Sequence, residues 1–166
     1  MTLKTASAED FVSLHKLVVL YCRGVDRRDI PLLRTLFHED CQMDYGVDHY
    51  LGPIAPWYDH VEPALANFAI TQHPITNSYF EVDGDYAEGE SYLISYHVLN
   101  GQPNNIYTAG ARYLDKFERR DDRVWRIAKR TSLRDWENSS GHVGEPHLGT
   151  LGKGDLSYNA ISMFAG

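Results

Sequence analysis

Apolar residues recur at spacings of three and four along the first part of the chain. After Ser7 they are Phe11, Leu14, Leu17, Val18, Tyr21 and Val25. This period is that of one face of an α-helix. Ser7 can cap such a helix, and Glu9 and Asp10 place acidic groups in its first turn. The pattern therefore predicts a helix over residues 8–27.

A second, shorter helix is predicted to follow. Asp29 can cap it, and Pro31 falls in the first turn, where a missing N–H costs nothing. Its apolar face carries Leu32, Leu33, Leu36 and Phe37. We then expect a short strand at 41–45, a loop at 46–53 and a third helix at 54–70, which Pro56 and Pro63 interrupt.

The apolar pattern changes to period two in the second half of the chain. It predicts strands at 77–82, 86–99, 106–119 and 124–136, joined by turns at 83–85, 101–104 and 120–122. Pro74 disfavours helical backbone at the residue before it, so we expect His73 at the head of a strand. Helices followed by antiparallel strands indicate an α+β fold, in which three N-terminal helices pack on a curved, mostly antiparallel sheet and leave room for a small-molecule cavity.

The end of the chain has a different character. Residues 137–166 are rich in glycine and serine, with scattered apolar positions. A chain of 166 residues is of single-domain length. We therefore expect one domain over 1–136 and an extended tail over 137–166 that packs on this domain or on a neighbouring subunit.

The composition limits the classes of molecule that this protein is expected to bind. The net charge of −7 argues against nucleic acid, which binds clustered positive charge. Cys22 and Cys41 do not make a disulfide framework, which favours a cytoplasmic location. The longest apolar run, at 17–22, is too short to span a membrane, so no membrane partner is expected. The aromatic content of 12% favours a small, fairly apolar ring molecule as ligand.

Four segments carry a resemblance to a known family. They are YCRGVDRRD at residues 21–29, LFHEDCQMDY at 36–45, QHPITN at 72–77 and VWRIAKRT at 124–131. With the order of elements, they make roughly residues 6–136 resemble the SnoaL-like branch of the NTF2-like superfamily. The resemblance implies a cone-shaped α+β barrel and a homo-oligomer, a trimer in the most similar members, with a dimer as the alternative.

The resemblance also implies a set of site residues. It extends to scytalone dehydratase, bile-acid 7α-dehydratase and hexachlorocyclohexane dehydrochlorinase, which are lyases with an Asp at the end of the first helix and a His after the third. Asp26 and His73 stand at those positions. Individual members also have residues that match Tyr21, Tyr45, His97 and Arg130. Val25 departs from the pattern, because scytalone dehydratase has a tyrosine there.

The chemistry of the two leading residues suits an elimination reaction. A histidine has an ordinary pKa near working pH, about 6.5, and can take a carbon-bound proton. A carboxylate on its other ring nitrogen selects the tautomer and stabilises the imidazolium. The alternatives are an Asp26 paired with a neighbouring arginine and a His73 bonded to backbone.

The remaining candidates have open alternatives as well. Tyr45 or Tyr21 could polarise an oxygen or protonate a leaving group, or could simply be core residues. His97 is either a second acid or base or an exposed strand residue. Alternation places Arg130 with Arg126 and Arg134 on a solvent-facing stripe, unless a bulge intervenes; in the pocket it could anchor an anionic or carbonyl group. Phe68 and Trp136 are expected to contact the substrate.

The sequence contains no spacing typical of a metal site or a dinucleotide loop, so we expect no metal and no cofactor. The function predicted is a cofactor-independent lyase, of dehydratase type, acting on a cyclic, largely apolar substrate. One alternative is a ring isomerase or cyclase in the same pocket. Another is a non-catalytic oligomerising subunit, like the small subunit of ring-hydroxylating oxygenases. An open cavity with the side chains of Asp26 and His73 both facing it would favour an enzyme, and a filled cone would favour the subunit.

Overall fold

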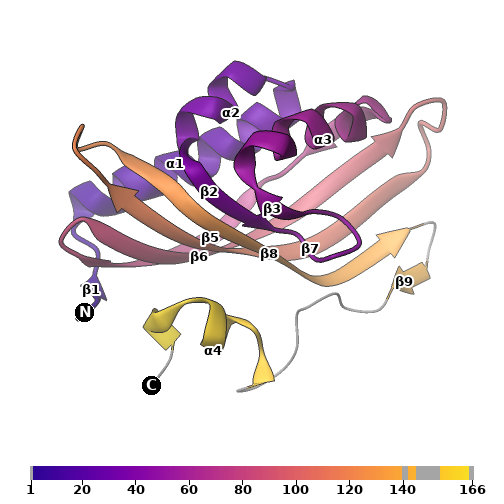
Figure 1. The fold of residues 1–166 in the computed structure, drawn as a ribbon. Helices are drawn as coiled ribbons and strands as arrows, with labels where there is room; N and C mark the ends of the chain where they lie inside the picture. The colour runs from indigo at the N-terminus through magenta and orange to yellow at the C-terminus, as the bar shows by residue number, and fades with distance from the viewer. Residues whose placement is uncertain (1, 140–141, 145–153, 165–166) are drawn as a thin grey trace.

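The computed structural model describes residues 2–139, 142–144 and 154–164. In this part of the chain, nine strands form one curved sheet (Figure 1). The path of neighbouring strands is β1-β5-β6-β7-β8-β2-β3, with β4 added to β6 and β9 added to β8. Strands β2 and β8 are parallel, and the other pairs are antiparallel. The predicted α+β fold is confirmed, although the sheet is curved rather than closed into a barrel.

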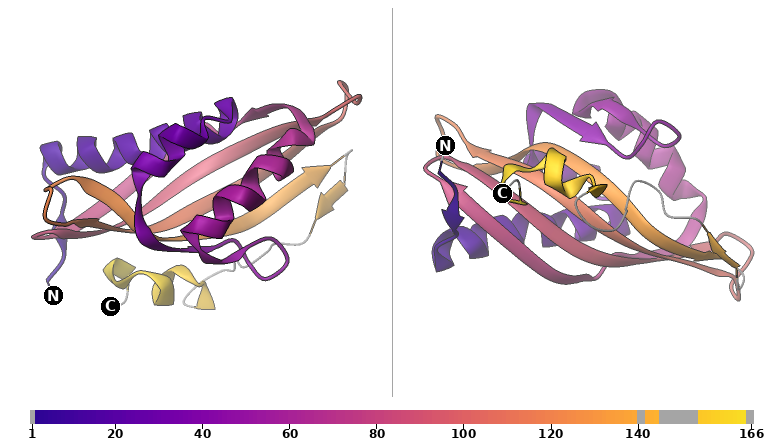
Figure 2. Two further views of the ribbon diagram at one scale, coloured as in Figure 1. Left: turned by 45° about the horizontal axis from the view of Figure 1, so that its top comes forward. Right: turned by 90° about the horizontal axis from the view of Figure 1, so that it is seen from below.

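Three helices cover one face of this sheet (Figures 1 and 2). They are α1 (Ala8–Arg27), α2 (Ile30–Leu36) and α3 (Ile54–Ala66). The Ser7 hydroxyl accepts a hydrogen bond from the Asp10 N–H at 3.1 Å, and the Asp29 carboxylate accepts one from the Leu32 N–H at 3.0 Å. These caps begin α1 and α2 where the sequence predicts them.

The strands span the rest of the domain. Their bounds are β1 (Lys4–Thr5), β2 (Phe37–Asp44), β3 (Leu51–Pro53), β4 (Phe68–Gln72), β5 (Ile75–Asp83), β6 (Tyr86–Leu99), β7 (Ile106–Arg119), β8 (Trp125–Ser139) and β9 (His142–Gly144). The bounds predicted for β6 and β7 are confirmed, and β8 continues past the predicted residue 136.

Two predicted segments have the wrong structure, and a further bound is wrong as well, because the strand expected at 41–45 begins at Phe37. The third helix ends at Ala66 instead of residue 70, because the following segment pairs with β6 as strand β4 and Ile70 and Thr71 suit a strand. The predicted loop at 46–53 contains β3, which pairs with β2. In both places, pairing with a distant strand decides the local structure.

Two bulges in β8 change which side chains face the helices. Ile127 pairs with Phe117 and Lys129 with Lys116, so Ala128 is an extra residue. Asp135 is a second extra residue, between the pairs Arg134–Ala111 and Trp136–Gly110. Each bulge shifts the alternation by one position. Arg130 therefore faces the helices, on the same side as Ile127, and the predicted solvent-facing arginine stripe is wrong.

The helices and the concave face of the sheet enclose the main core. The buried side of α1 carries Leu14, Leu17, Val18, Tyr21, Cys22 and Val25. No helix in the described part of the chain is long and apolar enough to cross a membrane.

The described end of the chain lies on the other face of the sheet (Figures 1 and 2). It contains α4 (Ser157–Ala160) and the 3-10 helix η2 (Ser162–Phe164). Ile161 packs there against Leu114 and Leu133. We call residues 154–164 the strap; the other parts of the predicted tail beyond β9 lie outside the described residues.

Candidate active site

A cavity of about 640 Å³ opens on the helix-covered side of the sheet. Its wall is formed by Tyr45, His49, Phe68, His73, Leu93, Ser95, His97, Leu99, Tyr107, Ala109, Ala111, Tyr113, Ser132, Arg134 and Glu137. Most of this wall comes from alternate residues of β6, β7 and β8, which place apolar side chains beside a few polar groups. This is the composition expected for a site that binds a small organic molecule.

Asp26 and His73 form a closely bonded pair at this cavity. The Asp26 carboxylate accepts a hydrogen bond from the His73 backbone N–H at 3.0 Å. Its other oxygen lies 2.6 Å from the His73 Nδ1 atom. The two side chains are 13% and 10% exposed. His73 lies between β4 and β5 and lines the cavity, whereas Asp26, in the last turn of α1, lies behind it.

This geometry decides which ring nitrogen of His73 can act as a base. A carboxylate at Nδ1 holds the proton on that nitrogen, which leaves Nε2 as the basic atom. The pair can therefore orient the imidazole for proton abstraction, and the carboxylate can stabilise the imidazolium that forms.

His97 extends the polar wall from β6. Its ring lies 5.1 Å from that of His73 and 5.7 Å from that of Tyr107, centroid to centroid. Burial lowers the pKa of His97 to about 4, and the neighbouring His73 adds to the shift, so this imidazole is neutral at neutral pH. Its buried Nδ1 atom has no partner among the described residues. Of the two positions considered for His97, the structure places it in the cavity.

Tyr45 lines the cavity and contacts a second, buried tyrosine. Its hydroxyl lies 2.6 Å from that of Tyr21, which is buried in α1. Burial raises the pKa of the Tyr45 hydroxyl well above its ordinary value, so it is a neutral phenol. If Tyr21 donates the hydrogen bond between them, the Tyr45 proton is available to a ligand.

Arg130 lies behind these tyrosines and does not line the cavity. Its guanidinium is 4.1 Å from the Tyr21 ring centroid and 4.0 Å from that of Tyr113. It binds the Asp115 carboxylate through two hydrogen bonds of 2.7 and 2.6 Å. Burial lowers the pKa of Arg130, but Asp115 outweighs this effect and holds that pKa well above its ordinary value. Arg130 is thus a buried charged group that contacts Tyr21 and Tyr113, and Tyr113 lines the cavity.

Of the two residues expected to contact the substrate, Phe68 and Trp136, only Phe68 lines the cavity. Phe68 lines the cavity from β4, with its ring 4.8 Å from that of His97. Trp136 does not line the cavity, and this expectation is corrected. It packs over Gly110 on the opposite face of the sheet, where an added Cβ on Gly110 would lie 2.0 Å from the indole nitrogen.

Sequence reasoning missed a polar group in the wall. Arg134, Glu137 and Tyr107 all line the cavity and contact one another. The bulge at Asp135 allows Arg134 and Glu137, three residues apart, to face the same side of β8. No local sequence signal marks that bulge.

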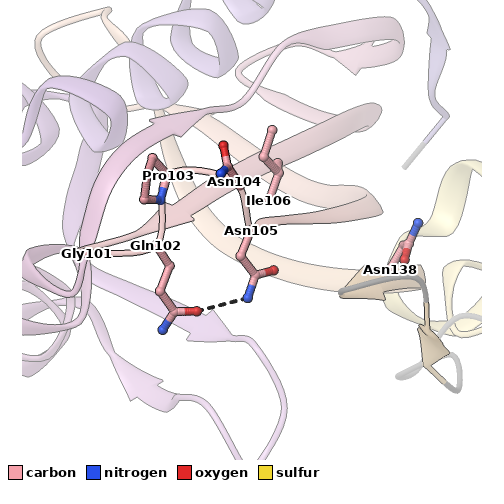
Figure 3. Close-up of a pocket in the computed structure, with 7 residues that line it drawn as sticks. All are labelled: Gly101, Gln102, Pro103, Asn104, Asn105, Ile106 and Asn138. Carbon is pink, nitrogen blue, oxygen red and sulfur yellow. Dashed lines mark hydrogen bonds between the residues drawn. The ribbon is translucent and has the colours of Figure 1, made fainter.

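A second hollow, of about 690 Å³, lies at the hairpin between β6 and β7 (Figure 3). It is lined by Gly101, Gln102, Pro103, Asn104, Asn105, Ile106 and Asn138. None of these side chains can act as an acid or base near neutral pH. Among the described residues, no three His, Cys, Asp or Glu side chains are grouped to hold a metal ion.

Comparison with known proteins identifies the family. The SnoaL-like domain family matches residues 6–131, and the chain belongs to this family. The resemblance read from the sequence is confirmed. No curated protein matches the chain significantly in sequence.

Solved structures share the fold at low sequence identity. A hexachlorocyclohexane dehydrochlorinase, LinA-type3 from Novosphingobium barchaimii, is 23% identical, with a TM-score of 0.69 over 81% of this chain and 92% of its own. A candidate scytalone dehydratase from Novosphingobium aromaticivorans is 18% identical, with a TM-score of 0.69 over 87% of this chain and 96% of its own. The Kfla4162 protein from Kribbella flavida is 19% identical, with a TM-score of 0.71 over 80% and 95%. At these identities the likeness concerns the fold.

Proposed function

We propose that this protein is a lyase that eliminates water from a cyclic, largely apolar substrate without a cofactor. The observation that carries the proposal is the 2.6 Å contact between Asp26 and the Nδ1 atom of His73, with His73 in the wall of an open cavity. The names of the two Novosphingobium neighbours, a dehydrochlorinase and a candidate dehydratase, favour elimination. The open cavity, which His73 faces while Asp26 is bonded behind it, favours an enzyme over a non-catalytic subunit.

The proposed reaction uses the groups in the cavity as follows. The Nε2 atom of His73 takes a proton from a ring carbon, and the electrons of that C–H bond form the new double bond as the neighbouring C–O bond breaks. The proton then leaves with the departing hydroxyl as water, so His73 returns to its neutral form. Asp26 orients His73 throughout, and the Tyr45 hydroxyl donates a hydrogen bond to the oxygen on which negative charge develops.

The test is turnover of cyclic β-hydroxyketones, followed by ultraviolet absorbance of the conjugated enone and by mass spectrometry. We expect His73→Ala to lower kcat/KM by about 10²–10⁴-fold, the usual contribution of a general base. Asp26→Asn should lower kcat strongly, because the amide no longer selects the productive tautomer. The matched control is His60→Ala, which removes an exposed histidine of α3.

Undiminished turnover in His73→Ala would refute the mechanism. A product of unchanged mass would identify an isomerase in the same pocket, and a product lighter by one water would identify the dehydratase.

A further inference from the structure

The polar group formed by Arg134, Glu137 and Tyr107 in the cavity wall contains a donor that no group of the described residues binds. The Nη1 atom of Arg134 lies 2.7 Å from Glu137 Oε2 and donates to the Tyr107 hydroxyl at 3.0 Å. Tyr107 donates its own proton to Glu137 Oε2 at 2.7 Å. We call these three residues the β8 triad. Their mutual contacts use the Nη1 side of the guanidinium only.

On the other edge of the Arg134 guanidinium, the Nε atom is unpaired. Its Nε atom is buried and has no hydrogen-bond partner among the described residues. In Arg112 and Arg130, the same Nε and Nη2 edge holds a carboxylate side-on, at 2.6 to 2.8 Å. A buried donor without an acceptor destabilises the folded protein, and a ligand oxygen that accepts its hydrogen bond would remove this penalty.

The charge of the triad limits what that oxygen can be. Glu137 already neutralises Arg134, so a ligand carboxylate would lie beside the Glu137 carboxylate and be repelled. A ketone or hydroxyl oxygen carries no such penalty. The triad therefore favours a neutral oxygen over an anionic one.

The position of the triad sets the length of the ligand. A line of contacts runs along the wall from His73 to His97, Tyr107 and Arg134. From His97 to Arg134 the line crosses from β6 to β8, which are two strand spacings, or roughly 10 Å, apart. His73 lies beyond this stretch, with its ring a further 5.1 Å from that of His97. A molecule that reaches both His73 and Arg134 is about as long as two or more fused rings.

We infer that Arg134 is a specificity-determining residue, which binds a ketone or hydroxyl oxygen at the end of a fused-ring substrate away from His73. This inference rests on the proposed function, since it names the substrate class of the same cavity. It concerns binding, so it can be tested without turnover.

The test compares three bicyclic probes of one shape: 2-tetralone, tetralin and tetralin-2-carboxylate. Affinities are measured by calorimetry on the full chain. We expect the wild-type protein to bind the ketone about tenfold or more tighter than the hydrocarbon, the usual range for a hydrogen bond to a charged group, and to bind the carboxylate weakly. Arg134→Met should abolish the preference for the ketone, and Arg134→Lys should restore part of it.

Glu137→Gln provides a second, independent measurement. It keeps a polar side chain but removes the neutralising charge, so the variant should gain affinity for the carboxylate probe. The matched control is Arg126→Met, because Arg126 lies on the same strand but pairs with Asp122 and does not line the cavity.

Three results would overturn the inference. They are equal affinity for ketone and hydrocarbon, no binding of any probe, and a preference for the ketone that persists in Arg134→Met. His73→Ala separates it from the proposed function, since this variant should keep the ketone preference. If the ketone preference depends on Arg134 while His73→Ala retains full turnover, the inference about Arg134 is supported and the Asp26–His73 mechanism is refuted.

Discussion

The role of a single residue in this protein depends on what surrounds it, and Arg130 is the clearest case. It is fully buried, and its guanidinium is held by Asp115 and lies against the rings of Tyr21 and Tyr113. A buried ion pair adds little net stability, because desolvation offsets the attraction between the charges. Removing one partner, however, leaves an uncompensated charge in the core.

We expect Asp115→Asn to lower the free energy of unfolding by roughly 3–5 kcal/mol, the usual cost of leaving one charge of a buried pair alone. The double variant Asp115→Leu with Arg130→Met should recover most of that loss, because it removes both charges. Urea unfolding of the two proteins measures the difference. A double variant no more stable than Asp115→Asn would contradict this account of the pair.

At the scale of elements, the site depends on how α1 meets its neighbours. Asp26 lies in the last turn of α1, two residues after Gly24, and that turn packs against α2. Gly24 permits this contact, because a Cβ there would lie 2.5 Å from the Cδ2 atom of Leu33, which is fully buried. The packing of α1 on α2 thus sets the place of the carboxylate that binds His73.

Gly24→Ala should lower the free energy of unfolding, because the added Cβ would come within 2.5 Å of the fully buried Leu33 side chain. Overpacking of this kind costs about 1–3 kcal/mol, and the better helix propensity of alanine returns about 1 kcal/mol at most. Thermal unfolding measures the net effect. Adding Leu33→Ala to Gly24→Ala should remove the clash, so the two changes should cost less together than their separate costs summed; simple additivity would argue against the contact.

Elements dominated by local pattern were the most predictable. The caps and apolar face of α1, the Asp29 cap of α2 and the alternation of β6 and β7 were all readable from neighbouring residues. Strand β4 and strand β3 were not, because each forms by pairing with a distant strand. The placement of Asp26 and His73 came from the family resemblance, since 47 residues separate them and no local rule joins them.

In the molecule as a whole, the two faces of the sheet have different partners. The cavity lies on the helix-covered face, and the strap lies on the other (Figure 2). Arg112 holds Asp155 through two hydrogen bonds of 3.0 and 2.8 Å, and the fully buried Glu88 accepts from the hydroxyl of Ser162 and the N–H of Met163. The strap therefore stabilises the sheet without contributing to the cavity wall.

Ending the chain after residue 153 should lower the free energy of unfolding by roughly 2–4 kcal/mol, from the lost burial of Ile161 and the lost partners of Arg112 and Glu88. The affinity of the shortened chain for 2-tetralone should stay unchanged. Urea unfolding and calorimetry measure the two quantities. A large loss of affinity would show that the end of the chain contributes to the site.

The sequence by itself determined the class of fold, the extents of the most regular elements and the family, because each rests on local periodicity or on short motifs. Only the tertiary structure decided which side chains share the cavity. Two extra residues in β8 turned Arg130 inward and brought Arg134 and Glu137 to the same wall, while Trp136 faces the other side. A bulge is produced by the pairing of two strands, so its effect on side-chain direction is visible only when the partner strand is in place.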